Sequence, residues 1–152
     1  MNIKKYKIMY YRGEPTNYLI NKNGKVLSTN YKGSGKIKRM KPKELRDGYL
    51  AVNLTINKKL HLVTIHRLVA ENFLYNDDPA NKTDINHKNG NKKDNRSKNL
   101  EYCTHKYNMK HAIDKGLRKY KVGNNSDLTK KEAKKIWREI IFFTKINDYR
   151  IK

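Results

Sequence analysis

Residues 85–104 read INHKNGNKKDNRSKNLEYCT, and Tyr107 and Asn108 follow soon after. The stretch opens on a short run that is typical of a β-strand and then enters a polar loop that contains Gly90. Residues 99–103 bring apolar side chains back, which indicates the returning strand of a hairpin. Thr104 can then cap a helix that runs to about residue 115. The stretch therefore predicts two short strands and a helix.

The chain before this stretch predicts further regular structure. Residues 65–73 place their apolar side chains on one helical face, and Asp77-Asp78-Pro79 follows as a stop signal. Tyr18–Ile20 and Val26–Leu27 flank Asn23-Gly24, which is the pattern of a tight hairpin. A second hairpin is predicted from residues 50–56 and 60–65.

Charge is the most unusual bulk property of the chain. Its 152 residues include 36 Lys and Arg but only 14 Asp and Glu, for a net charge of +22. An AT-rich coding sequence alone would produce many Lys, Asn and Tyr codons, but it would not exclude Glu. The asymmetry excludes an ordinary neutral enzyme and favours a polyanionic partner.

Several classes of protein are excluded by composition. No apolar run approaches the length of a membrane span, and the N-terminus lacks a signal-peptide core, so we expect a cytoplasmic protein that does not bind membranes. A single cysteine, Cys103, allows neither an internal disulfide nor a zinc site built on several cysteines. Any metal must use oxygen or imidazole ligands.

Three polar residues of the opening stretch matter because of their spacing. His87, Asn99 and Asn108 are separated by 12 and 9 residues. Taken singly, they are an exposed hairpin histidine, a turn former and a polar helix residue. Their joint occurrence within one strand–loop–strand–helix frame is what favours a functional site.

In this frame the run INHKNGNKKDNRSKNLEYCT with the following YN resembles the HNH endonucleases, the ββα-metal nucleases of phage and intron homing enzymes. IHRLVAENF, at 65–73, resembles the helix that precedes the motif in that family. NYLINKNGKVLS and MKPKELRDGYLAVNL are similar to the small β module that lies N-terminal to it. The resemblance covers about residues 10–116 and is strongest over 62–112.

The resemblance implies roles for individual residues. Its catalytic set would be His87, Asn99 and Asn108, with His87 as the general base and Asn99 tying the loop or orienting His87. Asn86 and Asn108 would hold one Mg²⁺ or Mn²⁺ ion per active site. Several family members have Asp where this chain has the neutral Asn86, which weakens cation binding unless the scissile phosphate supplies charge.

The resemblance also implies the reaction. A monomer with one active site would nick one strand of double-stranded DNA, and double-strand cutting would need a dimer or a second encounter. The alternative is a non-catalytic DNA- or RNA-binding protein on an HNH scaffold, which fits the charge equally well. The pairing of His87 with Asn108 discriminates between the two, because a pure binding protein has no need of it.

The fold class that follows is α+β, in three segments. Residues 1–62 would be a basic β-hairpin module that binds DNA, 63–116 a ββα-metal HNH core, and 117–152 a linker with a basic amphipathic helix. That helix begins at the capping box Thr129–Glu132 and resembles the start of a truncated helix-turn-helix.

Most of the positive charge lies in the two flanking segments, where it would grip the DNA backbone. Residues 32–39 form a basic loop, either a solvated surface or a phosphate-tracking arm. His66 is expected to have a structural hydrogen-bonding role, and His61 shows no distinguishing feature. The side chains expected to contact DNA are Lys36, Lys38, Arg39, Lys88, Lys92, Lys93, Arg96, His111, Lys134 and Arg138.

Overall fold

The computed structural model describes residues 3–118, 121–122, 126–127, 135 and 138. The chain divides into two compact units, residues 1–105 and 106–152, which are described separately. The predicted amphipathic helix from Thr129 lies outside the described residues, apart from Lys135 and Arg138, which are helical and exposed. Neither helix of the described part has the length and apolarity that a membrane span requires.

The N-terminal sheet of the first unit has four antiparallel strands in the order β1-β2-β3-β4. They are β1 (Tyr6–Tyr11), β2 (Glu14–Asn21), β3 (Val26–Ser28) and β4 (Lys38–Arg39), with short 3₁₀ turns at Ile3–Lys5 and Tyr31–Gly33. The β2–β3 hairpin confirms the prediction from Asn23-Gly24. The expectation of a loop was wrong for residues 38–39, because β4 pairs with the open edge of β3.

A second sheet contains β5 (Lys43–Glu44), β6 (Leu50–Ile56) and β7 (Lys59–Thr64). Asn57 and Lys58 form the two-residue turn between β6 and β7, and both have positive φ, at 50° and 62°. Such turns match the twist of a tight hairpin. The hairpin agrees with the alternation of apolar residues in the sequence.

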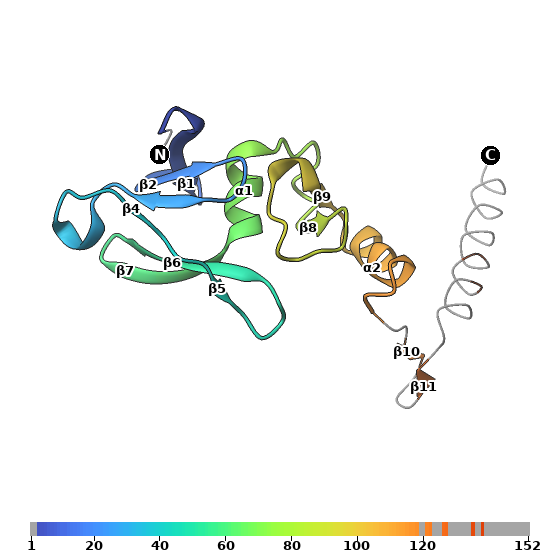
Figure 1. Cartoon of the computed structure of the whole chain (residues 1–152). Coiled ribbons are helices and arrows are strands. Elements are labelled where there is room, and N and C mark those ends of the chain that lie inside the picture. Colours follow the sequence, from blue (N-terminus) through green and yellow to red (C-terminus); the bar gives the residue numbers. More distant parts are fainter. Residues whose placement is uncertain (1–2, 119–120, 123–125, 128–134, 136–137, 139–152) are drawn as a thin grey trace. The chain divides into compact units, whose positions relative to one another are not determined.

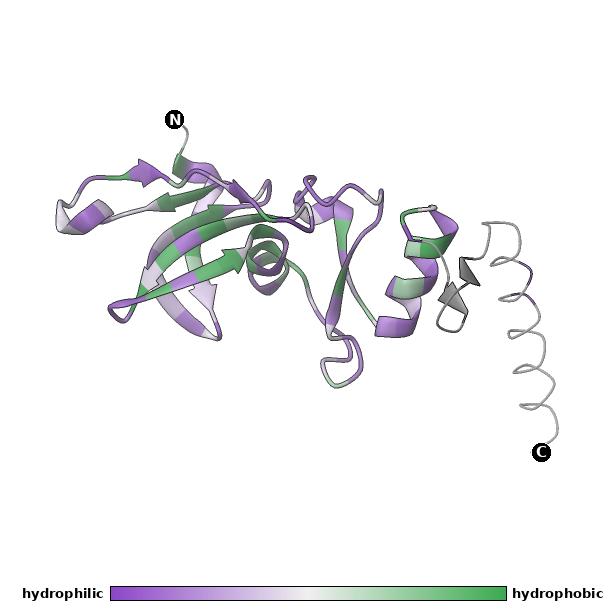
Figure 2. Cartoon of the chain, turned by 90° about the horizontal axis from the view of Figure 1, so that it is seen from below, coloured by the Kyte–Doolittle hydropathy of each residue, from purple (hydrophilic) through white to green (hydrophobic). Residues whose placement is uncertain are grey.

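Helix α1 (Ile65–Phe73) organises the core of this unit. In Figure 1 it lies between the two N-terminal sheets and the hairpin of β8 (Asp84–His87) and β9 (Leu100–Cys103). Figure 2 shows hydrophobic residues concentrated in the strands and in α1, with hydrophilic residues in the loops. The fully buried side chains Leu54, Leu68 and Leu100 belong to one cluster, so the sheets, α1 and the hairpin share a single core.

The β8–β9 hairpin is antiparallel and pairs His87 with Leu100. A 3₁₀ turn at Ser97–Asn99 leads into β9, and α2 (His105–Asp114) follows. The strand–loop–strand–helix order confirms the α+β prediction. In the second unit, β10 (Lys121–Val122) pairs with β11 (Ser126–Asp127).

Helix α2 ends at a glycine motif, close to the end predicted at about residue 115. Gly116 has a φ of +68°, and its N–H donates to the carbonyl of Ile113. The N–H of Leu117 donates to the carbonyl of Ala112, which completes a Schellman motif. Glycine adopts this backbone conformation without the steric cost that a Cβ would add.

Candidate active site

His87 lies at the end of β8 and is only 5% exposed. Its Nε2 lies 3.2 Å from Oδ1 of Asn95. The Asn95 amide donates to the carbonyl of Lys93 at 3.3 Å, which turns its oxygen toward the ring. Because that oxygen accepts a hydrogen bond, Nε2 carries the imidazole proton and Nδ1 keeps the lone pair. Burial lowers the pKa of His87, against a smaller opposite effect of the Asn95 contact.

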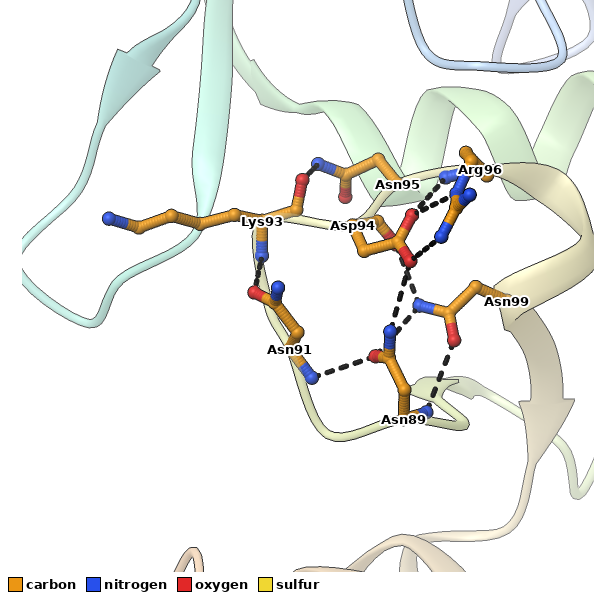
Figure 3. A network of polar contacts seen from close by, with 7 residues as sticks. All are labelled: Asn89, Asn91, Lys93, Asp94, Asn95, Arg96 and Asn99. Atoms are coloured by element: carbon orange, nitrogen blue, oxygen red, sulfur yellow. Dashed lines mark hydrogen bonds and ion pairs between the residues drawn. The ribbon is translucent and has the colours of Figure 1, made fainter.

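Asn99 ties the loop between β8 and β9 (Figure 3). It is 8% exposed, and its Oδ1 accepts from the N–H of Asn89 at 3.1 Å. Its Nδ2 donates to Oδ1 of Asn89 at 3.0 Å and to the carbonyl of Asp94 at 2.8 Å. The contact to the His87 ring is made by Asn95 and not by Asn99. The resemblance left two roles open for Asn99, and these contacts correspond to tying the loop and not to orienting His87.

Asp94 and Arg96 form an ion pair within the same loop, as Figure 3 shows. Arg96 donates two hydrogen bonds to the Asp94 carboxylate, at 2.7 and 2.6 Å. The Arg96 hydrogen bond is the main cause that lowers the pKa of Asp94 to about 2. Arg96 was expected to contact DNA, and in this structure its guanidinium is held by Asp94.

The turn between β2 and β3 supports the loop from the other side. The N–H of Ser97 donates to the carbonyl of Lys22 at 2.8 Å. Gly24 approaches so closely that a Cβ there would lie 2.7 Å from Cγ2 of Ile65 and 3.3 Å from Cβ of Asn95. Gly24 also has a φ of +75°, so only glycine fits this position without strain. The N-terminal sheet therefore helps to place the residue that contacts His87.

Asn86, the predicted metal ligand in this unit, is buried on β8. Its Nδ2 donates to Oε1 of Glu101 at 2.8 Å, which fixes the orientation of its amide. Among the described residues no group of three or more His, Cys, Asp or Glu side chains is arranged to hold a metal. The Asn86 amide oxygen is nevertheless a hard donor of the kind Mg²⁺ prefers, so the donor chemistry fits such an ion.

Two further rings contact His87. The ring centroids of Tyr49 and His66 lie 5.9 and 5.3 Å from that of His87. Burial is the largest cause of the low pKa of His66, which is about 3. Burial is also the largest cause that raises the pKa of Tyr49. The hydrogen bond expected of His66 is not found at Nδ1, which is buried without a partner among the described residues.

The basic residues of the first unit that were predicted to bind DNA differ in their contacts. Lys92 donates to the carbonyl of Asp47 at 2.8 Å, and Lys93 lies 2.9 Å from Oε1 of Glu44. These contacts attach the β8–β9 loop to β5 and to the segment between β5 and β6. The other side chains predicted to bind DNA here are Lys36, Lys38, Arg39 and Lys88, and all four are exposed.

The remaining predicted residues belong to the second unit. Asn108 and His111 are half-buried on α2, and the His111 ring stacks with Tyr107 at a centroid distance of 6.4 Å. Arg138 is exposed, and Lys134 lies outside the described residues.

Sequence reasoning missed the contact of Asn95 with His87 and the packing of Tyr49 on it. Asn95 is one of several asparagines in a polar loop, and nothing in its spacing distinguishes it from Asn89 or Asn91. Tyr49 lies immediately before β6, next to the predicted strand 50–56. Only the packing of the β5–β6 segment against the β8–β9 loop brings it to His87.

Comparison with known proteins identifies the family. Residues 63–110 match a family described as HNH endonuclease. An uncharacterized HNH endonuclease of Acanthamoeba polyphaga mimivirus is 42% identical over 106 residues, which is 70% of this chain and 30% of that protein. YosQ of the SPbeta prophage of Bacillus subtilis, whose name also describes an HNH homing endonuclease, is 37% identical over 84 residues, 55% of this chain and 47% of YosQ.

A solved structure shows the same similarity. The structure that describes DNA binding and cleavage by the HNH homing endonuclease I-HmuI matches with a TM-score of 0.60 and 29% identity, over 76% of this chain and 61% of that one. The chain thus spans less than half of the two curated relatives and less than two thirds of I-HmuI. The β8–β9 hairpin with His87, the matched residues 63–110 and these relatives together show that this region of the chain belongs to the HNH endonuclease family.

Proposed function

We propose that this chain is a metal-dependent DNA endonuclease of the homing type that nicks one strand of double-stranded DNA. The observation that carries the proposal is the placement of His87, a buried imidazole at the end of β8 whose Nε2 lies against Oδ1 of Asn95, a contact that leaves the lone pair on Nδ1. Such a group can accept a proton from water at physiological pH. A protein that only binds DNA has no need of a base prepared in this way.

We assign one proton-transfer step to the protein side chains. His87 Nδ1 takes a proton from a water molecule, and the resulting hydroxide attacks the phosphorus of the scissile phosphodiester. One P–O bond forms, the P–O bond to the leaving sugar oxygen breaks, and that oxygen takes a proton from solvent water. Asn95 holds Nε2 throughout, because its oxygen still accepts the Nε2 hydrogen bond when the ring is protonated. Asn99 keeps the loop that carries Asn95 closed.

A divalent cation, Mg²⁺ or Mn²⁺, would stabilise the extra negative charge of the phosphate when it is bound. Asn86 and Asn108 would hold it through their amide oxygens. Glu101, whose carboxylate accepts the Asn86 amide hydrogen at 2.8 Å, places negative charge beside the neutral ligand. This supports cation binding although position 86 is not an aspartate.

DNA as substrate is supported by charge and by relatives. The net charge of +22 favours a polyanion, and I-HmuI is described as binding and cleaving DNA. Lys36, Lys38 and Arg39 are exposed and would contact the backbone from the β3–β4 region. A monomer with one such site would cut one strand in each encounter.

Relaxation of supercoiled plasmid tests the proposal. We expect open circles with Mg²⁺ or Mn²⁺, no change with EDTA, and loss of cleavage in His87→Ala while DNA binding and the melting temperature show a folded protein. His61→Ala is the matched control, because His61 is a half-buried histidine of the same unit without an assigned role. If His87→Ala cleaves like the wild type, His87 is not the base. Intact plasmid with a salt-sensitive gel shift would instead support the alternative, a DNA- or RNA-binding protein on this scaffold.

A further inference from the structure

Three rings from separate elements meet beside the candidate base. The Tyr49 and His66 centroids are 4.7 Å apart, and the His87 centroid lies 5.9 Å from the first and 5.3 Å from the second. Tyr49 precedes β6, His66 lies in the first turn of α1, and His87 ends β8. All three distances are in the range of aromatic packing, so each ring contacts the other two.

Tyr49 and His66 have supports that do not involve His87. The Nζ of Lys92 lies 4.6 Å from the Tyr49 ring centroid and also donates to the carbonyl of Asp47. The N–H of Tyr49 donates to Oδ1 of Asp47 at 3.3 Å. His66 is carried by α1, where it is buried at 6% exposure. Side chains that are fixed in this way can restrict the rotation of a third ring that packs on them.

His66 also has a buried ring nitrogen, Nδ1, without a hydrogen-bond partner in the part of the chain that the structure describes, whereas buried polar atoms are normally hydrogen-bonded. An apolar ring of similar size would leave no polar atom unsatisfied at this place. Departures of this kind are expected at functional positions rather than at purely structural ones.

We propose that Tyr49 and His66 are positioning residues that hold the His87 imidazole in the ring orientation needed for proton abstraction. The inference rests on the proposed function, because that function makes His87 the base. The two rings hold the imidazole with Nε2 against the Asn95 oxygen, so that Asn95 keeps the proton on Nε2 and leaves the lone pair on Nδ1. The site would therefore extend beyond the β8–β9 hairpin to α1 and to the segment before β6.

The test uses matched pairs of variants. His66→Ala and Tyr49→Ala remove a ring, whereas Tyr49→Phe keeps the ring and loses only the hydroxyl. His61→Ala is the control for His66→Ala, because His61 makes the same kind of edge contact, with Tyr11 at 5.5 Å. If His66→Ala fails to fold, His66→Leu, which keeps most of the volume without a ring, replaces it.

Cleavage and binding are measured separately, as the single-turnover rate at saturating protein and the affinity for DNA in EDTA. We expect both ring deletions to lower the rate by about tenfold or more while affinity changes by less than about threefold, because misplacing a reacting group costs rate rather than binding. Tyr49→Phe should keep more of the wild-type rate than Tyr49→Ala does, and His61→Ala should stay within about threefold of the wild-type rate. Wild-type rates in the ring deletions, or rates that fall only in step with affinity, would overturn the proposal.

A second readout does not depend on cleavage. The ¹⁵N spectrum of the His87 imidazole, assigned by its loss in His87→Gln, should show one tautomer in the wild type and exchange between two in His66→Ala and Tyr49→Ala. If the wild type does not cleave DNA but the spectra change in this way, the proposed function is wrong and the positioning contact stands. An unchanged spectrum in both ring deletions would refute the positioning role.

Discussion

Replacement of Asn99 by alanine should open the β8–β9 loop and destabilise the whole first unit. The change removes three hydrogen bonds, two to Asn89 and one to the carbonyl of Asp94. Each such bond contributes about 1 kcal/mol net. Asn89 is exposed and can turn to water, whereas the Asp94 carbonyl contact is partly buried, so we expect a loss of about 2–3 kcal/mol.

The assay is urea denaturation followed by circular dichroism, with thermal melting as a second measurement. At about 2–4 °C per kcal/mol for a chain of this size, the melting temperature should fall by roughly 5–10 °C. Asn91→Ala is the matched control. Asn91 is an exposed asparagine of the same loop whose Oδ1 accepts one hydrogen bond, from the N–H of Lys93 at 3.0 Å.

The comparison between the two variants decides the outcome. Asn91→Ala should lose about 1 kcal/mol or less, because its single bond is exposed to water. Equal losses in the two variants, or a loss below about 1 kcal/mol in Asn99→Ala, would show that the Asn99 contacts do not hold the loop.

Three further predictions concern packing, pH and salt. Gly24→Ala should destabilise the protein by about 2–4 kcal/mol, because of the left-handed backbone and the close approach to Ile65. Gly33→Ala is the control, since Gly33 has a φ of +76° and nothing lies within 4 Å of a Cβ placed there, so only the backbone cost applies. Equal melting temperatures of the two variants would contradict this prediction. Because the pKa of His66 is lowered to about 3 in the folded protein, the unfolded state binds more protons below its ordinary value of 6.5, so the free energy of unfolding should fall by about 2 kcal/mol between pH 7.5 and 5. Urea midpoints measure this loss, and His66→Phe should remove most of it; an unchanged slope would refute the assignment. Charge removal from the β3–β4 region should reduce the slope of log Kd against log salt by up to about 3 without changing the melting temperature, as fluorescence anisotropy can show, and an unchanged slope would place the DNA elsewhere. The variant for this test is Lys36→Gln, Lys38→Gln and Arg39→Gln combined.

Local patterns in the sequence predicted most of the hairpins and both described helices. The β2–β3 and β6–β7 hairpins follow from turn residues and alternation, which depend on neighbours a few positions apart. β1 was not predicted, and its register shifts between Ile8 and Tyr10. β4 was not predicted either, because a two-residue strand exists only where another strand offers an open edge.

The candidate site divides in a similar way. His87, Asn99 and Asn108 were found from spacing, since the motif lies within one short segment of the chain. Lys92, Lys93 and Arg96 were predicted to contact DNA. In the structure each of them has a carbonyl or carboxylate partner within the protein. A sequence shows that a residue is basic, but it does not show whether an acidic group lies within reach.

By itself, therefore, the sequence indicated the HNH family, the α+β class and the candidate base, because these depend on residue types at short and regular separations. The tertiary structure decided what surrounds His87. Asn95 reaches Nε2 because Gly24 and Lys22 of a distant turn support its loop, and Tyr49 and His66 reach the ring because α1 and the β5–β6 segment pack against the hairpin. These contacts join residues that are far apart in the chain, and only the shared core of the first unit brings them together.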